Sequence, residues 1–234
     1  MRHTPGFVLS EREEIKRLIR ENPWATLVSN TDKGDLVASH YPMILDESPE
    51  AEDAIVLLSH VGRPDDRLLE LGRHELLVII QGPHGYISPT WYTELPSVPT
   101  WNFVTAHLFG TPEILSDEEN LRVLEKLVDH FEHRLPNPYR LADTVADAEY
   151  AARTATGTVG FRLTVTRLVA KNKMSQNKPA ETIERVIAEL EGDGPYASEA
   201  LAGEMRRVHD LQTHHRPTDD RQAHGRPTDD GLSR

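Results

Sequence analysis

The sequence predicts a mainly β fold of the α+β class, an antiparallel barrel with peripheral helices. The early predicted strands follow one another in hairpin-like succession, without a helix between each pair, and this favours antiparallel pairing over a doubly wound parallel sheet. The motifs GxGxxG, GxxxxGK[ST], HExxH and GxSxG are all absent. The common nucleotide-binding, metalloprotease and hydrolase folds therefore have no motif in this chain.

Each element follows from local patterns along the chain. Ser10 and Glu13 are spaced as a capping box and start a first helix, which Pro23 ends. Strands are then expected at 24–29, 36–45, 54–60, 75–81, 86–89 and 101–110, with a hairpin turn at 31–35. Ser116 and Glu119 form a second capping box before a helix. A late strand at 158–169 and helices at 182–190 and 198–209 complete the prediction.

The chain divides into two parts of unequal character. Residues 1–210 are enough for one large domain with a sizeable core. Residues 211–234 contain a polar, proline-bearing ten-residue repeat (HHRPTDD followed by HGRPTDD), and we expect a disordered tail there. The four arginines of the tail balance its four aspartates, so the formal charge of −12 belongs entirely to residues 1–210.

Composition excludes several classes of protein. With no cysteine, the chain cannot be a disulfide scaffold or hold a thiolate zinc or iron–sulfur site. Its longest apolar runs fall far short of the ~18 residues that span a bilayer, so no membrane partner is expected. The first ten residues lack the apolar region of a signal peptide, which predicts a cytoplasmic location. The acidic balance argues against nucleic acid as a partner.

A first candidate for chemistry lies at the end of a predicted strand, in the sequence SHVGRP at 59–64. His60 is well placed there to face a ligand, and Gly62 allows close approach of the backbone. The Arg63 guanidinium offers a fork for a phosphate or a carboxylate. The alternative is a plain turn with an exposed histidine and a surface arginine.

Two aromatic segments form the second candidate. The sequence QGPHGYISPTWY at 81–92 predicts a rigid, shaped loop that includes His84 and Tyr86, and VPTWNF at 98–103 adds Trp101 and Asn102. Aromatic side chains with polar groups suit a flat, partly apolar ligand. The alternative is ordinary packing within the barrel. His40, in ASHYP at 38–42, sits where strand alternation could turn it inward.

A third candidate is the segment KNKMSQNK at 171–178, which holds three of the six lysines in the chain. In an acidic protein this segment is a local electropositive spot. Lys171 and Lys173, with the polar Ser175 and Gln176, suit a phosphate, a propionate or an amino-acid carboxylate. The alternative is a solvated loop.

Several of these motifs occur together in one order: ASHYP, SHV, QGPHGYISP, WY, VPTWN and KMSQN. The series resembles the PaiB family, described as FMN-binding negative transcriptional regulators, over about residues 7–190. The resemblance implies a split β-barrel of the FMN-binding or pyridoxamine-phosphate-oxidase-like type. It also implies a homodimer with the cofactor cleft at the subunit interface.

The resemblance also extends to a specialised branch of that family, the haem-dependent piperazate synthases. These enzymes form the N–N bond of L-piperazic acid, a nonribosomal-peptide precursor, from N5-hydroxy-L-ornithine. The chain departs from the usual family pattern at 61–65, between 92 and 98, and at 171–173. These segments are expected near the cofactor, so the departures weaken a direct FMN assignment and favour a repurposed pocket.

The resemblance therefore leaves two cofactors, haem b and FMN. Haem needs an axial ligand, and without cysteine His60 is the first candidate, with His84 and His40 in reserve. The expected cofactor-binding residues are His60, Arg63, His84, Trp101, Asn102, Lys171, Lys173, Ser175 and Gln176. The expected catalytic residues are His60, Tyr86 and Lys173, acting on a small amino-acid substrate. The alternatives are an FMN-binding regulator or flavin-dependent oxidoreductase, and a barrel without cofactor that binds other proteins.

Overall fold

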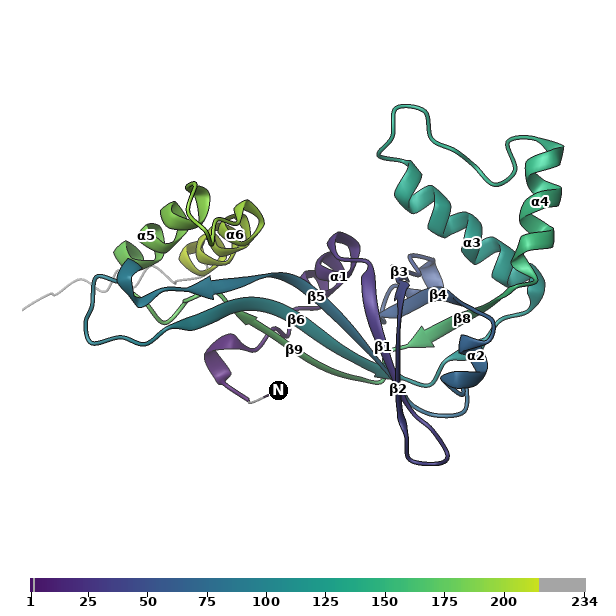
Figure 1. Cartoon of the computed structure of the whole chain (residues 1–234), viewed down its shortest axis with the longest axis horizontal. Helices are drawn as coiled ribbons and strands as arrows, with labels where there is room; N and C mark the ends of the chain where they lie inside the picture. The colour runs from purple at the N-terminus through teal and green to yellow at the C-terminus, as the bar shows by residue number, and fades with distance from the viewer. Residues whose placement is uncertain (2, 215–234) are drawn as a thin grey trace, which may run out of the picture.

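The computed structural model describes residues 1 and 3–214 and arranges them in two antiparallel sheets with helices on their faces (Figure 1). The strand order is β2-β1-β5-β6-β9 in the five-stranded sheet and β3-β4-β8-β7 in the four-stranded sheet. The strands are β1 (Trp24–Asn30), β2 (Leu36–Pro42), β3 (Ile44–Leu45), β4 (Val56–Gly62), β5 (Leu76–Ile87), β6 (Thr100–Gly110), β7 (Glu113–Ile114), β8 (Thr158–Thr164) and β9 (Arg167–Lys173). The antiparallel prediction with peripheral helices is confirmed.

The helices cover separate regions of the two sheets. They are α1 (Arg12–Glu21), α2 (Asp65–Leu68), α3 (Asp117–Glu132), α4 (Val145–Ala155), α5 (Ala180–Glu191) and α6 (Glu199–His214). Short 3₁₀ turns occur at Pro5–Phe7, Pro49–Ala51 and Pro89–Trp91. Figure 1 shows α5 and α6 over the far end of the long β5–β6 hairpin, and α3 and α4 at the other end of the molecule. Within the described residues, no helix combines the length and apolar character needed to cross a membrane.

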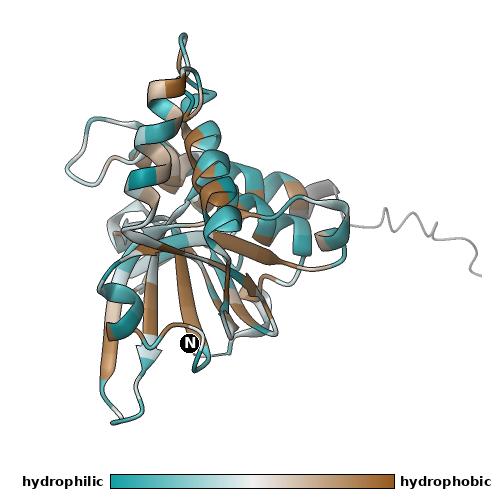
Figure 2. Cartoon of the chain, turned by 90° about the vertical axis from the view of Figure 1, so that its right-hand side faces the viewer, coloured by the Kyte–Doolittle hydropathy of each residue, from teal (hydrophilic) through white to brown (hydrophobic). Residues whose placement is uncertain are grey.

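One large apolar core joins the two sheets. The apolar face of α1 (Ile15, Leu18 and Ile19) is fully buried, and so are Val78 of β5 and Phe161 of β8 in the same core. Figure 2 shows hydrophobic residues along the strands, and hydrophobic and hydrophilic residues interleaved on the longer helices. Removing this apolar surface from water stabilises the fold by roughly 25 cal/mol per Å².

The β5–β6 pairing contains a bulge. Between the paired positions, β5 advances three residues, from Gln81 to His84, while β6 advances two, from Thr105 to Phe103. The extra residue is accommodated around Gly82, where a Cβ would lie 2.7 Å from side-chain atoms of Leu18 and of Val104. A bulge of this kind reverses the alternation that would otherwise follow along the strand.

The structure corrects several element boundaries. The capping box predicted at Ser10 and Glu13 is wrong, because α1 begins at Arg12 and its N-cap residue is Glu11, whose side chain makes no capping hydrogen bond. The capping box of Ser116 and Glu119 is confirmed at the start of α3. The predicted strands 75–81 and 86–89 are one strand, β5, because the bulge interrupts the apolar alternation without ending the pairing.

Other differences from the prediction arise where one long stretch of strand-forming residues is divided by a turn into two strands. The predicted strand 36–45 divides into β2 and β3, and the predicted strand 158–169 divides into β8 and β9, which belong to different sheets. Helix α4 was not predicted. Helix α6 runs to His214, beyond the expected domain boundary at 210. The rest of the expected tail, residues 215–234, lies outside the described residues.

A paired glycine substitution tests the packing where β6 ends. A Cβ on Gly110 would lie 2.3 Å from the carbonyl oxygen of Thr164, whereas a Cβ on Gly203, in α6, would meet nothing within 4 Å. We expect Gly110→Ala to lower the free energy of unfolding by about 1–3 kcal/mol through overpacking. Gly203→Ala should raise it by up to ~1 kcal/mol through helix propensity. Urea denaturation of both variants measures the two effects, and a stable Gly110→Ala protein would contradict the register of β6.

Candidate functional site

The five-stranded sheet has an outer face that points away from the core. Leu76, Val78 and Ile80 point into the core, so their neighbours in β5 point outward, and the bulge keeps His84 and Tyr86 on the outward side. Cross-strand partners share a face. Successive rows on this outer face are Tyr86 and Trp101, then His84, Phe103 and Lys173, then Gln81, Thr105 and Lys171. The structure thus brings five residues that the sequence singled out together on one face of the sheet: His84, Tyr86, Trp101, Lys171 and Lys173.

Aromatic rings form one end of this face. The Tyr86 ring meets the Trp101 ring edge-on at 6.4 Å between centroids, and the His84 ring stacks on Trp101 at 6.5 Å. Tyr196, from the α5–α6 connection, lies 4.9 Å from Tyr86. The Trp101 side chain remains 54% exposed. Exposed rings with polar groups can stack against a flat ligand.

Lysine side chains form the other part of the site. The Lys173 ammonium donates to the Thr100 hydroxyl and to the Trp101 carbonyl oxygen, the latter at 2.9 Å. Burial, with a smaller contribution from the Lys171 charge, lowers the pKa of Lys173 below its usual value. Lys171 contacts the ring of Phe7, which belongs to the N-terminal segment.

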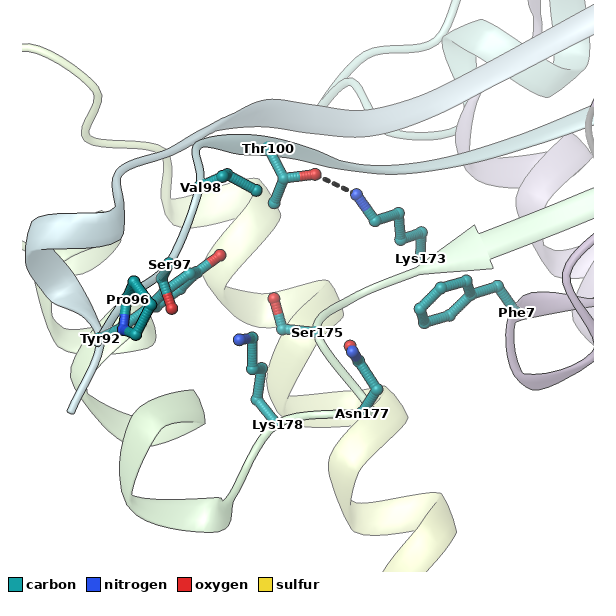
Figure 3. Close-up of a pocket in the computed structure, with 10 residues that line it drawn as sticks. All are labelled: Phe7, Tyr92, Pro96, Ser97, Val98, Thr100, Lys173, Ser175, Asn177 and Lys178. Carbon is teal, nitrogen blue, oxygen red and sulfur yellow. Dashed lines mark hydrogen bonds between the residues drawn. The ribbon is translucent and has the colours of Figure 1, made fainter. Parts of the chain in front are cut away.

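The Lys173 side chain also lines a pocket of about 510 Å³ beside the start of β6 and the end of β9 (Figure 3). Its walls come from the N-terminal segment, the 92–98 loop and the 175–178 loop: Phe7, Tyr92, Pro96, Ser97, Val98, Thr100, Lys173, Ser175, Asn177 and Lys178. The Lys178 ammonium lies 4.5 Å from the centre of the Tyr92 ring. Two ammonium groups with hydroxyl and amide donors can hold an anionic group such as a phosphate or carboxylate.

Two predicted residues lie behind this face, and a third lines the pocket. Asn102 is fully buried and donates to the Ser175 hydroxyl at 2.9 Å. Gln176 accepts from the Met174 backbone and donates to the Asn172 carbonyl, both at 2.6 Å. Ser175, held at a positive φ of 62°, lines the pocket in Figure 3. Asn102 and Gln176 therefore shape the loop that carries Ser175.

His60 stands in the other sheet, near the end of β4. Its ring is half-buried and meets Tyr41 edge-on at 5.9 Å, and its Nδ1 has no hydrogen-bond partner within the described part of the chain. Burial lowers the pKa of His60, which keeps the ring neutral near pH 7. The Tyr41 hydroxyl donates to Asp65 at 2.9 Å and accepts from the Gly62 backbone at 3.0 Å. A neutral imidazole with a free ring nitrogen can bind a metal ion.

Arg63 lies beside this histidine in sequence. Its guanidinium forms an ion pair with Asp66 at 3.2 Å and donates to the Thr156 carbonyl at 3.3 Å. Figure 1 places α2, which follows Arg63, at the opposite end of the molecule from the far end of the β5–β6 hairpin. Within one chain the predicted site is therefore two separate groups, with His60 and Arg63 apart from the aromatic rings and the lysines.

Sequence reasoning misplaced one histidine and missed several contributors. His40 is exposed on the outer face and stacks on Trp24 at 6.5 Å, because β2 alternates opposite to the inward turn expected for it. Thr100, Lys178 and Tyr41 lie next to predicted residues but were not assigned to the site. Tyr196 carried no sequence pattern that pointed to this site, since it comes from a loop more than 90 residues along the chain from Trp101.

Comparisons with known proteins identify the family of the chain. A family model described as a putative FMN-binding domain matches residues 1–167. The chain is 30% identical over 192 residues to the protein named protease synthase and sporulation protein PAI 2 of Bacillus subtilis (strain 168), and the match covers 80% of this chain and 87% of that protein. The resemblance to the PaiB family is confirmed.

Solved structures agree on the fold. A protein described as the FAD and haem binding protein from Mycobacterium smegmatis matches with a TM-score of 0.53 and 20% identity, covering 80% of each chain. The flavocytochrome Anf3 from Azotobacter vinelandii matches with a TM-score of 0.53 and 13% identity, covering 74% of this chain and 72% of that one. The split-barrel prediction is confirmed.

The buried position of His60 predicts a pH-dependent stability. Its folded-state pKa lies below the reference value of 6.5, so the unfolded chain takes up the proton first as the pH falls. Well above pH 6.5 the ring is neutral in both states and contributes nothing to the dependence. We expect wild type to lose free energy of unfolding from pH 7 to pH 5 more steeply than His60→Asn, as measured by urea denaturation. An equal loss in both proteins would contradict the buried environment of the ring.

Proposed function

The chain belongs to the putative FMN-binding domain family, and on this premise we propose that it is a haem-dependent enzyme of the piperazate synthase type. Its reaction closes N5-hydroxy-L-ornithine to L-piperazic acid, a precursor for nonribosomal peptides, with loss of water. The observation that carries the proposal is the environment of the His60 ring. It is half-buried and neutral near pH 7, and its ring makes no hydrogen bond to the described residues.

The residues present fit haem. A neutral imidazole is the usual axial ligand when no cysteine is available, and the chain contains no cysteine. Propionate groups need cationic or hydroxyl donors, which Lys171 and Arg63 supply. Two structural neighbours are described by name as binding haem together with a flavin or as a flavocytochrome, which supports haem on this fold.

A homodimer completes the site. One chain keeps His60 apart from the aromatic rings and lysines, so a cofactor that touches both groups needs a second copy. The outer face of the five-stranded sheet also exposes apolar side chains that a second copy would cover, with Ile79 and Val169 in the same cross-strand row. The family resemblance supports the same arrangement, with the cleft between subunits.

The proposed reaction balances without an added oxidant or reductant. A bond forms between the α-nitrogen and N5 of the substrate, the N5–O bond breaks, and the oxygen leaves as water. The α-nitrogen gives up one proton and the leaving oxygen gains one. Haem, when bound, supplies the electronic activation of the N–O bond. The protein orients the substrate and moves the proton.

Lys173 and Tyr86 are the residues to which we assign this proton transfer. The lowered pKa of Lys173 makes its amine a better base near neutral pH. The Tyr86 hydroxyl stands on the same face and can donate toward the leaving oxygen. The pocket of Figure 3 offers Lys178 and Ser97 for the substrate carboxylate.

A second candidate is an FMN-binding regulator or flavin-dependent oxidoreductase. The family description favours FMN. The outer face also has what FMN requires, since Trp101 and Tyr86 can stack against an isoalloxazine ring and the lysine pocket can hold its phosphate. In that case His60 would have no role as a metal ligand.

An absorption spectrum of the purified chain, with each cofactor added in turn, separates the two candidates. We expect an intense Soret band with haem, and the mass of a product lighter than N5-hydroxyornithine by one water. His60→Ala should lose the ligand-dependent features of the spectrum. The Lys173→Met variant should keep haem and lose most turnover, by roughly 100-fold if proton transfer is its task.

The contrary outcomes are equally specific. A flavin spectrum with tight FMN binding and no Soret band would favour the second candidate. An unaltered haem spectrum in His60→Ala would remove His60 as the axial ligand. His3→Ala, which changes an exposed histidine near the N-terminus, is the matched control for the loss of an imidazole.

The dimer has its own test on the outer face. We expect wild type to elute at twice the monomer mass in size-exclusion chromatography with light scattering. Ile79→Glu should shift it toward the monomer, because the charge would be buried in the interface. Ile114→Glu, on the exposed strand β7 of the other sheet, is the matched control and should leave the mass unchanged. A monomeric wild type would contradict the dimer.

A further inference from the structure

Two buried polar atoms near the end of β4 have no hydrogen-bond partner among the residues that the structure describes. One is Nδ1 of His60 and the other is the side-chain oxygen of Asn120, which is only 3% exposed and sits in the first turn of α3. An unsatisfied buried acceptor costs about 1–3 kcal/mol, so such atoms call for an explanation.

Gly160 of β8 connects the two side chains. It is the cross-strand partner of His60, so the His60 side chain and the missing Gly160 side chain belong to the same face of the sheet. A Cβ on Gly160 would lie 2.7 Å from the Asn120 side-chain oxygen. The absence of a side chain at Gly160 therefore lets Asn120 sit directly on the sheet, beside His60.

The orientation of the Asn120 amide follows from its other contacts. Its nitrogen donates to the Thr158 hydroxyl at 2.9 Å and to the Ala155 carbonyl at 3.4 Å. The Thr158 hydroxyl gives its own proton to the Ala155 carbonyl at 2.8 Å, so it can only accept from Asn120. A flipped amide would place its oxygen against a carbonyl oxygen. The Asn120 oxygen is thus fixed toward Gly160 and the histidine.

We propose that Asn120 is a positioning residue for His60: its side-chain oxygen accepts the Nδ1 proton of the ring directly, after a small ring rotation, and so leaves Nε2 as the free lone pair. This hydrogen bond satisfies both unpartnered atoms and fixes the tautomer, because the amide oxygen can only accept a proton. Fixing one ring nitrogen by a hydrogen bond determines which nitrogen is available to a ligand.

Only the role of this hydrogen bond, which is to present Nε2 to the cofactor, rests on the proposed function. The tautomer itself belongs to the protein without cofactor. The Tyr41 ring, packed edge-on against His60, limits how far the imidazole can rotate. Asn120 and Tyr41 together would hold the ring from two sides.

Nitrogen-15 NMR of the histidine rings tests the tautomer directly, on the full chain without cofactor at pH 8, where His60 is neutral. We expect the His60 resonances, assigned by their loss in His60→Asn, to show a protonated Nδ1 and an unprotonated Nε2. Asn120→Ala should shift the ring toward the Nε2-protonated form. Asn120→Asp, which keeps an acceptor of the same shape, should retain the protonated Nδ1.

The control is Asn22→Ala, which removes a different asparagine amide, one that donates to the Leu18 carbonyl at the end of α1. It should leave the His60 tautomer unchanged. A protonated Nε2 in wild type, or a protonated Nδ1 that persists in Asn120→Ala, would overturn the proposal. Failure of the chain to bind haem or to dimerise would count against the proposed function and would leave this result intact.

Discussion

The pairing of β5 with β6 is the constraint on which the rest of the site depends. The bulge between Gln81 and His84 inserts one residue into β5 and keeps the strand paired on both sides of it. Without the insertion, strict alternation would turn His84 and Tyr86 toward the core and Gly85 outward. With it, both side chains share the outer face with Trp101 and Lys173. The close packing around Gly82 leaves no room for a side chain at this point, so the glycine and the bulge belong together.

The separation between the His60 group and the group of aromatic rings and lysines follows from the same hairpin. The hairpin carries the aromatic rings, and β9, which pairs with β6, carries the lysines, away from the four-stranded sheet, where His60 and Arg63 remain. The acidic chain concentrates half of its few lysines at the end of β9 and in the loop after it, which explains why an anionic group would bind there in spite of the net charge of −12. Asn102, Ser175 and the buried Glu204, which pairs with Arg17 and Arg207, hold α6 and the loop after β9 in place behind this surface.

Much of this arrangement could be predicted from sequence, and the exceptions have physical causes. Apolar alternation identified most strands, and the ordered motifs identified the family, because both depend on residues close together in the chain. The joining of 75–81 and 86–89 into one strand could not be predicted, since a bulge interrupts the period without breaking the hydrogen-bonded ladder. Tyr196 and Asn120 reach their sites only through the tertiary fold. The resemblance named the segments expected near a cofactor, but it could not show that one chain divides them into two groups.

We propose that two subunits each contribute half of one site. The most direct test mixes two inactive variants, His60→Ala and Lys173→Met, after unfolding and refolding them together. If the site is shared, half of the dimers are mixed and each mixed dimer regains one intact site, so about one quarter of wild-type activity should return. Mixing two samples of the same variant should restore none. No recovery in the mixed sample, with normal dimers present, would contradict a site built between subunits.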